Sequence, residues 1–467
     1  MEQLAPACSS PQAWARARRH LLSHLVCFGR HTITGLLRLQ DRTQQDWTAD
    51  YRFYAEEHFD EGVVFAQVRS QVEALLPTTQ APLVVAMDDS LLRKSGRKIS
   101  GVRYLRDPMS PPFHVNFVRG LRVLQISAAI PEGLEGAARL IPVDFQQAAL
   151  PVKPRKLAPA HLHEAYELER AKKNINLVGR QRLAQLRKQM DESGSAQRQL
   201  IVSIDGRFTN ATVLREVPQR TTLIGRVRKD SVFFHPPQTQ PEHGRKRKYG
   251  QRTPTPQELL KDESVPWQKV QAFAAGKSHE FEVKTLSPIY TQMDKAKNSL
   301  RLVVVKPVRY RLTKTQTDRR EPAFLICTDP DLPLEKVLQY YLWRWDIEVN
   351  FRDEKTLLGV GQAQVRSEAS NQHAPALAVA AYSLLLLAAT QVYGRSGRPE
   401  TFQCPRWHKR RPTQRATTND LRNQVRYELW ASALGRHFRP LSSHKGTDQN
   451  GKKCDLPLES ALFTSIK

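Results

Sequence analysis

The chain has 467 residues, and its 72 Lys and Arg against 46 Asp and Glu give a formal net charge of +26 and a pI of about 10.1. This length exceeds one typical domain and predicts about two to four of them. The charge excludes an acidic protein and favours a polyanionic partner, above all nucleic acid, although a generally basic soluble protein or a membrane-surface binder would have a similar charge.

The cysteines and the hydropathy of the sequence indicate the cellular compartment in which the protein is expected to fold. The five cysteines are scattered without a CxxC pair, which argues against a disulfide framework or a zinc site and favours a reducing cytoplasm. No basic-then-apolar secretory signal opens the sequence. The apolar run Ala376–Ala389 is shorter than the roughly 20 residues that span a bilayer, so it predicts a core helix. We therefore expect a cytoplasmic protein with no membrane partner.

Residues 1–205 predict an α/β fold preceded by helices. Residues 12–80 have apolar positions at helical spacing, which indicates an N-terminal helical domain over residues 1–80. Two later apolar runs of strand length each end in an acid. PLVVAMDDS ends at Asp88 and Asp89, and LIVSI is followed by Asp205. Strands that end in acids predict an α/β sheet with carboxylates gathered near its strand ends.

The composition and the hydrophobic pattern change in the next segment. Residues 231–331 open with a Pro-rich, basic loop and continue with β-type runs such as SLRLVVVKPVRYRL, which predicts a β-rich insertion domain. The insertion divides a core into a first part, residues 81–230, and a second part, residues 332–395. Residues 396–467 form a basic C-terminal region.

The segment LPLEKVLQYYLWRWDIEVNFRDEKTLLG predicts one uninterrupted helix over Leu334–Leu358 that stops at Gly359. At about 100° per residue, four polar residues fall within an arc of about 60°. They are Tyr341, Arg344, Glu348 and Lys355. Such a stripe can be a solvated salt-bridge ladder or one side of a binding site.

An adjacent apolar stripe on this helix favours the binding site. It consists of Trp343, Ile347 and Phe351 and would seat the helix on a core, which holds the polar stripe in a fixed place. Glu348 is then a candidate metal ligand, while Arg344 and Lys355 are candidate phosphate partners. Three acids that neighbour the polar stripe are expected to face solvent: Asp346, Asp353 and Glu354.

The spacing Y-(2)-R-(3)-E-(6)-K of the polar stripe resembles the YREK signature of DDE transposases from bacterial insertion sequences, of the insertion-sequence-four type. MDDS at Met87–Ser90 is similar to the first acidic motif of that family, a strand followed by D-x-[ST]. IDGRFTN at Ile204–Asn210 is similar to the second. The resemblance covers roughly residues 80–395.

The resemblance implies an RNase H-like fold that carries the β-rich insertion. It also implies that Asp88, Asp205 and Glu348 are the catalytic acids and hold two Mg²⁺ ions, with Mn²⁺ able to substitute. The D-x-[ST] pattern selects Asp88, but a shift of one residue in strand register would select Asp89. The expected activity is cut-and-paste transposition through hairpin ends, by a homodimer assembled on double-stranded DNA.

Further DNA contacts follow from the resemblance and from charge. The YREK residues Tyr341, Arg344 and Lys355 would contact terminal phosphates, and the N-terminal helices would recognise the element's ends. Two basic segments are candidates for phosphate contact or for solvated loops. They are His408–Arg415 and the loop that contains Arg245, Lys246, Arg247 and Lys248.

The sequence gives less specific indications for the roles of tryptophan and histidine side chains. Three tryptophans are candidates to stack on a base flipped out of the helix, with plain packing as the alternative. They are Trp267, Trp343 and Trp345. The lone residues His114 and His373 are expected to be structural. Two rival functions stay open: an RNase H-like DNA nuclease without strand transfer, and a non-catalytic DNA-binding descendant of a transposase.

Overall fold

The computed structural model describes residues 2–96, 98–107, 110–111, 113–132, 136–151, 153–241, 243–311, 317–395 and 415–438. Of the predicted C-terminal region it therefore includes only residues 415–438. The basic segment His408–Arg415 lies outside the described residues except for Arg415.

The N-terminal residues form helices, as predicted. The elements are a 3₁₀ helix, η1 (Glu2–Ala7), and four α-helices, α1 (Pro11–Val26), α2 (Ile33–Leu39), α3 (Thr48–Ala55) and α4 (Glu61–Ala74). Three of the α-helices begin at a residue whose side chain accepts a backbone N–H, namely Ser10, Thr32 and Asp60. Their apolar faces share one hydrophobic core with the long helix α11 (Glu368–Tyr393).

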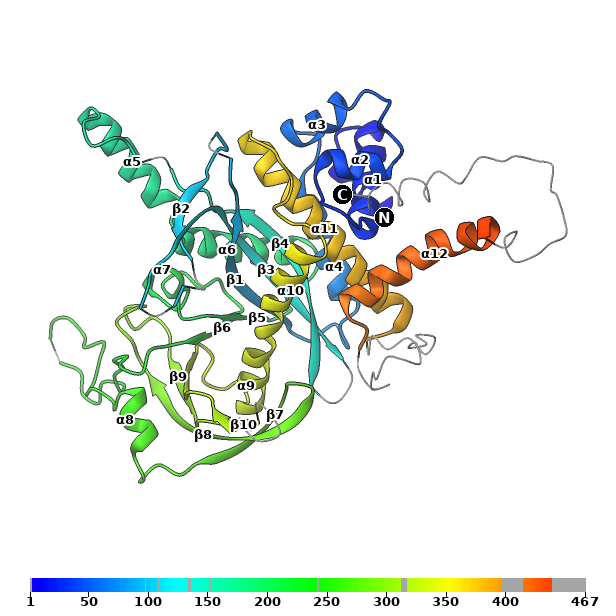
Figure 1. Ribbon diagram of the computed structural model, residues 1–467. Coiled ribbons are helices and arrows are strands. Elements are labelled where there is room, and N and C mark those ends of the chain that lie inside the picture. The colour runs from blue at the N-terminus through cyan, green and yellow to red at the C-terminus, as the bar shows by residue number, and fades with distance from the viewer. Residues whose placement is uncertain are drawn as a thin grey trace, which may run out of the picture.

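The centre of the molecule is a ten-stranded mixed sheet (Figure 1). Its strands are β1 (Leu83–Arg93), β2 (Arg103–Arg106), β3 (Phe117–Glu132), β4 (Ala137–Gln147), β5 (Leu200–Ile204), β6 (Thr221–Arg226), β7 (Gln268–Ala274), β8 (Lys277–Ile289), β9 (Leu300–Val305) and β12 (Ala323–Cys327). A separate two-stranded sheet pairs β10 (Arg309–Arg311) with β11 (Thr317–Arg319).

The strand order confirms the predicted RNase H-like α/β fold. β1 pairs antiparallel with β3 and parallel with β5, and β5 pairs parallel with β6. β4 pairs with β3 on the side away from β1. The β-rich residues 231–331 then extend the same sheet beyond β6 in the order β12, β9, β8, β7, because β12 pairs antiparallel with both β6 and β9.

Helices cover both faces of the sheet. α9 (Leu334–Trp343) and α10 (Trp345–Thr356) pack on the face that carries Val84 and Ala86 of β1. α6 (Ile175–Glu192) covers the other face, where Met87 lies against Gly179. Of the shorter helices, α7 spans Ala211–Leu214 and α8 spans Pro256–Lys261. α5 (Ala160–Lys172) buries no residue and projects from the body of the molecule near β2 (Figure 1).

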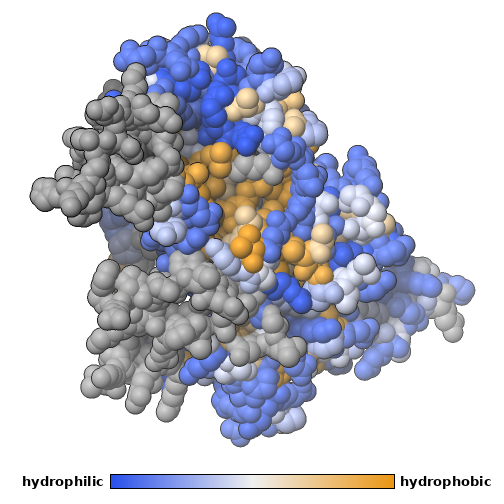
Figure 2. Space-filling model, turned by 90° about the vertical axis from the view of Figure 1, so that its right-hand side faces the viewer, coloured by the Kyte–Doolittle hydropathy of each residue, from blue (hydrophilic) through white to orange (hydrophobic). Residues whose placement is uncertain are grey.

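The long helix α11 contains the predicted core helix Ala376–Ala389, and the burial of these residues confirms that prediction. By length and composition alone α11 could cross a membrane, but 72% of its most apolar window is buried inside the fold. Such burial is typical of a core helix. Seen from the side where α11 and α12 (Thr418–Phe438) lie, the surface has an apolar area bordered by hydrophilic residues (Figure 2).

Two arginines of helix α12 bind the carbonyl end of α1. Arg422 donates to the carbonyls of Leu25 and Cys27 at 3.0 and 2.7 Å, at the end of α1. Arg426 donates to the Val26 and Cys27 carbonyls at 3.2 and 2.8 Å. Positive charge at a helix C-terminus is favourable, because the unpaired carbonyls there carry partial negative charge.

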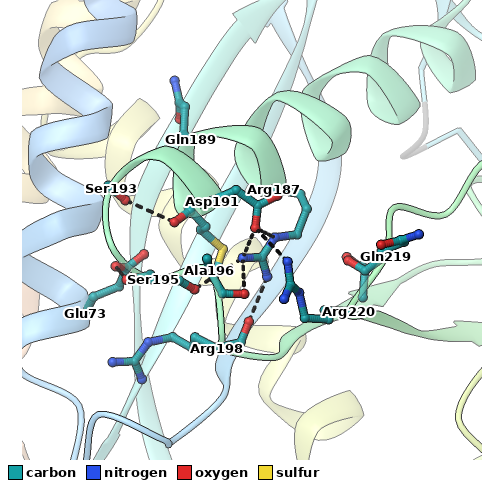
Figure 3. A network of polar contacts seen from close by, with 12 residues as sticks. Glu73, Arg187, Gln189, Asp191, Ser193, Ser195, Ala196, Arg198, Gln219 and Arg220 are labelled. Carbon is teal, nitrogen blue, oxygen red and sulfur yellow. Dashed lines mark hydrogen bonds and ion pairs between the residues drawn. The ribbon is translucent and has the colours of Figure 1, made fainter.

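A polar network fixes the entry to β5, the strand that ends at Asp205 (Figure 3). Arg187 of α6 donates to the Arg198 carbonyl at 2.7 Å and to Asp191 Oδ1 at 2.7 Å. Ser195, in the loop between α6 and β5, donates to Glu73 of α4. The network therefore holds α4, α6 and the start of β5 in one arrangement.

Candidate active site

Asp88 and Glu348 lie on either side of one guanidinium group. Asp88 is in β1, on the face covered by α10, and Arg344 Nη1 donates to its Oδ2 at 2.9 Å. Arg344 Nη2 donates to Glu348 Oε1 at 3.4 Å. The Asp88 side chain is 15% exposed, whereas the Glu348 side chain is 41% exposed. Arg344 therefore joins a buried acid of the sheet to a half-exposed acid of the helix.

Asp205 lies close enough to influence Asp88. It directly follows β5, and its Oδ1 accepts the backbone N–H groups of Arg207 and Phe208 at 3.0 and 3.2 Å. Burial and, next, the nearby Asp205 charge raise the pKa of Asp88 to about 7, while Arg344 partly opposes both. A buried acid whose pKa is raised by a neighbouring acid is typical of metal and catalytic sites.

Asp89 points to the other face of β1, because successive strand residues alternate. Its carboxylate lies 3.3 Å from Arg122 Nε and 3.2 Å from Arg207 Nη1. Burial raises the pKa of Asp89, and the two arginines oppose that shift. Asp88, and not Asp89, thus faces Arg344 and Glu348.

The predicted single helix Leu334–Leu358 is wrong in one respect, because it is divided at Arg344 into α9 and α10. At the junction the hydrogen bonds run to the third residue back. Arg344 N–H donates to the Tyr341 carbonyl and Ile347 N–H to the Arg344 carbonyl, both at 3.1 Å. These tightened turns interrupt the regular helix without a Gly or Pro.

The polar stripe faces β1 on the same side as Asp88. Lys355 Nζ donates to Ser90 Oγ at 2.6 Å, and Ser90 lies two residues beyond Asp88. Tyr341 presents its ring to Arg344, whose guanidinium carbon is 5.7 Å from the ring centre. The apolar stripe packs as predicted, with Ile347 and Phe351 buried.

Two of the acids predicted to face solvent are in fact buried. Asp353 is 5% exposed and accepts from Thr418 Oγ1 at 2.6 Å. Glu354 is 1% exposed and accepts from Gln125 Nε2 at 2.9 Å. The third, Asp346, is partly exposed and pairs with Arg415 at 3.0 Å. The helical wheel missed these contacts because Thr418, Gln125 and Arg415 all lie outside this helix.

Glu354 and Gln125 are residues near the site that the sequence did not indicate. Gln125 is the cross-strand partner of Asp88, so both side chains stand on the face that α10 covers. Burial raises the pKa of Glu354 to about 8. Burial therefore favours the neutral form of this carboxyl group, which accepts a hydrogen bond from the cross-strand partner of Asp88.

The three candidate tryptophans differ in exposure. Trp343 Nε1 donates to the Gly136 carbonyl at 2.6 Å. The ring of Trp267 is contacted by two ammonium groups, Lys284 at 4.5 Å and Lys306 at 5.1 Å from its centre. Trp345 is 61% exposed. Only Trp345, of these three, presents most of its surface to solvent.

The other predicted residues lie apart from the acids. Arg245, Lys246, Arg247 and Lys248 are exposed on the loop that precedes α8 (Figure 1). His114 is exposed, and His373 lies 3.2 Å from the Tyr54 carbonyl and 3.5 Å from Glu61, between helices of the core.

The donor chemistry of the site fits a hard divalent cation, since Asp88, Asp205 and Glu348 all offer carboxylate oxygens. Arg344 lies between two of them, and no group of three His, Cys, Asp or Glu side chains in the described ranges has metal-site spacing. A bound cation therefore requires Arg344 to turn away. The Arg344 Nε atom is buried without a hydrogen-bond partner among the described residues, so a further acceptor would satisfy it.

A family model described as DDE superfamily endonuclease matches residues 4–285, which is more than half of the chain. The matched range includes Asp88 and Asp205 and ends before Glu348. No curated protein matches the sequence.

Proposed function

Because the chain belongs to the DDE superfamily of endonucleases, we propose that it is a DNA transposase of the YREK group. It would bind the ends of an insertion sequence, cleave them by hydrolysis and transesterification through hairpin ends, and join them to target DNA. The observation that carries the proposal is the arrangement of Arg344, which contacts Asp88 and Glu348 while Asp205 lies beside Asp88.

Asp88, Asp205 and Glu348 would hold two Mg²⁺ ions, or Mn²⁺ in their place. Such ions, when bound, activate the attacking water or hydroxyl and neutralise the leaving oxygen of a phosphodiester. Asp88 must lose its proton to act as a ligand, and the pKa of about 7 makes that loss dependent on pH near neutrality.

The YREK cations would orient the scissile phosphate. Arg344 has a planar fork of donors suited to phosphate oxygens, and its Nε is the unpartnered buried donor of the site among the residues described. Lys355 lies on the same side of β1 and offers its ammonium group once it leaves Ser90. Tyr341 supports Arg344 through its ring.

Of the three tryptophans, Trp345 is best placed to stack on an unpaired base of a DNA hairpin. It directly follows Arg344, and its 61% exposure leaves ring surface for stacking. Trp343 is held by Gly136, and lysines already contact the Trp267 ring. We also propose that the protein acts as a homodimer, since two element ends must be paired before cutting.

The decisive experiment incubates the purified protein with DNA that carries the element's own ends and Mg²⁺. A transposase yields hairpins and joined products, whereas nicks alone identify an RNase H-like nuclease without strand transfer. Binding of ends without any cutting identifies a non-catalytic descendant.

A matched pair of variants controls the assay. Glu348→Gln keeps the size of the side chain and removes its charge, so it should abolish cutting and leave end binding intact. Glu335→Gln, at an exposed position in α9, should cut like the wild type. If Glu348→Gln cut normally, the assigned site would be wrong.

A further inference from the structure

The sheet carries a strongly basic ribbon beyond the candidate active site. Residues 90–123, which contain the end of β1, all of β2 and the start of β3, hold eight Lys and Arg and one Asp. Five of the described cations are engaged within the fold. Two of them, Arg103 and Arg119, donate to backbone carbonyls. Arg93 pairs with Asp107, Lys94 donates to the Gly361 and Ala363 carbonyls, and Arg122 pairs with Asp89. The ribbon still keeps an excess of positive charge.

The strand register fixes which side chains share the face of the catalytic acid. Asp88 stands opposite Gln125 of β3, and the β1–β3 pairing continues without a bulge as far as Gly120. Alternate residues of β3 from Gln125 outward therefore occupy that face, including Arg119 and Phe117. β2 pairs Tyr104 with Arg119 and Arg106 with Phe117, which places Tyr104 and Arg106 there as well.

Aromatic and basic groups alternate at the outer end of this face. Tyr104 is 69% exposed and Phe117 is 63% exposed. The Arg119 guanidinium lies 5.6 Å from the centre of the Tyr104 ring, and Arg106 is exposed. Large exposed aromatic rings next to cations are unfavourable for a merely solvated surface and are typical of nucleic-acid contact.

Between this outer end and the acids the face is covered. Leu92 and Leu121 are buried, and Gly361, in the segment that follows α10, lies against Leu92. The outer end is therefore a second contact region, separated from the catalytic acids by a ridge.

From these observations we propose that the outer ribbon binds the backbone of duplex DNA on one side of the scissile phosphate, through Tyr104, Arg106 and Phe117 together with Lys98, which is exposed between β1 and β2. The proposal rests on the proposed function and adds a surface to it. From Gln125 to Phe117 the strand advances eight residues, or about 26 Å at roughly 3.3 Å per residue. Duplex DNA rises 3.4 Å per base pair, so the contact falls about eight base pairs from the cut.

The test measures how DNA affinity depends on salt in a Glu348→Gln background, which separates binding from cutting. Two probes are duplexes that carry an element end followed by about 2 or about 12 base pairs of flanking DNA. The third probe is an unrelated duplex, which is added to protein that is already bound to a pre-cut end. Removing two phosphate contacts should lower the slope of log K against log salt by about 1.8. We expect that loss for the variant Lys98→Gln/Arg106→Gln.

Two variants control for charge and folding. Lys188→Gln/Lys336→Gln removes the same charge from exposed positions in α6 and α9 and should keep the wild-type slope. Lys98→Arg/Arg106→Lys keeps the charge on the ribbon and should also keep the wild-type slope.

The probes distinguish the source of the DNA. A lower slope with the long flank but not the short one supports contact with flanking DNA, and a lower slope only with the unrelated duplex supports contact with target DNA. Equal slopes for the ribbon variant and its α6/α9 control, or a ribbon effect on anionic phospholipid vesicles alone, overturn the proposal. Failure of the wild type to bind any DNA would instead refute the proposed function.

Discussion

The buried position of Asp88 predicts how the stability of the protein depends on pH. The pKa of Asp88 is about 7 in the folded protein and 3.8 in the unfolded chain. An acid whose pKa is raised by folding stabilises the fold fully below pH 3.8, and that contribution is lost as the pH rises through 7. Between pH 5.5 and 8.5 the free energy of unfolding should fall by about 2 kcal/mol, because the titration spans about 1.5 pH units from pH 5.5 to the pKa of about 7. Asp88→Asn does not titrate and should avoid this loss.

The measurement is urea unfolding at pH 5.5, 7.0 and 8.5 in EDTA, for the wild type and Asp88→Asn. Glu354 is present in both proteins, so its own titration cancels in the difference. Asp230→Asn, at a side chain 63% exposed, is the matched control and should follow the wild type. If Asp88→Asn lost stability in parallel with the wild type, Asp88 would be charged throughout and the argument from burial would be refuted.

Four more outcomes are expected. Protonation of Asp88 competes with Mg²⁺, so the apparent Mg²⁺ affinity measured by calorimetry should fall about tenfold per pH unit below 7. Gly359→Ala should lower the free energy of unfolding by about 2–4 kcal/mol, because Gly359 has φ +66° and an added Cβ would lie 2.3 Å from the His31 Cβ; a smaller loss in urea unfolding would contradict the contact. Glu354→Leu should lose about 1–3 kcal/mol by leaving one N–H of the buried Gln125 amide without its acceptor, since only the contact with Ser127 remains, whereas Glu354→Gln, which keeps an acceptor, should lose less. Trp345→Ala should reduce hairpin formation more than nicking in a gel assay, and an equal loss of both would remove the stacking role.

Local patterns in the sequence predicted much of the fold and of the site. Asp88 and Asp205 were marked because each ends a buried apolar run, and the apolar stripe of α10 because helical periodicity is a local property. Long-range pairing was not visible in this way. The addition of β12 to β6 depends on contacts such as Leu325 with Arg226, about a hundred residues apart. The hydrogen bond between Gln125 and Glu354 joins residues 229 positions apart, so the wheel placed Glu354 in solvent.

The order of synthesis gives the contacts of α12 a further consequence. The carbonyls at the end of α1 belong to residues 25–27, and the arginines that bind them are Arg422 and Arg426, nearly 400 residues later. At about 5–20 residues per second, a ribosome needs about 20–80 s to make the chain between them. During that time the first helix leaves the ribosome without its final partners. The contacts between α1 and α12 therefore form only after residues 422–426 have been made, and nascent chains cut short before α12 should be more prone to degradation.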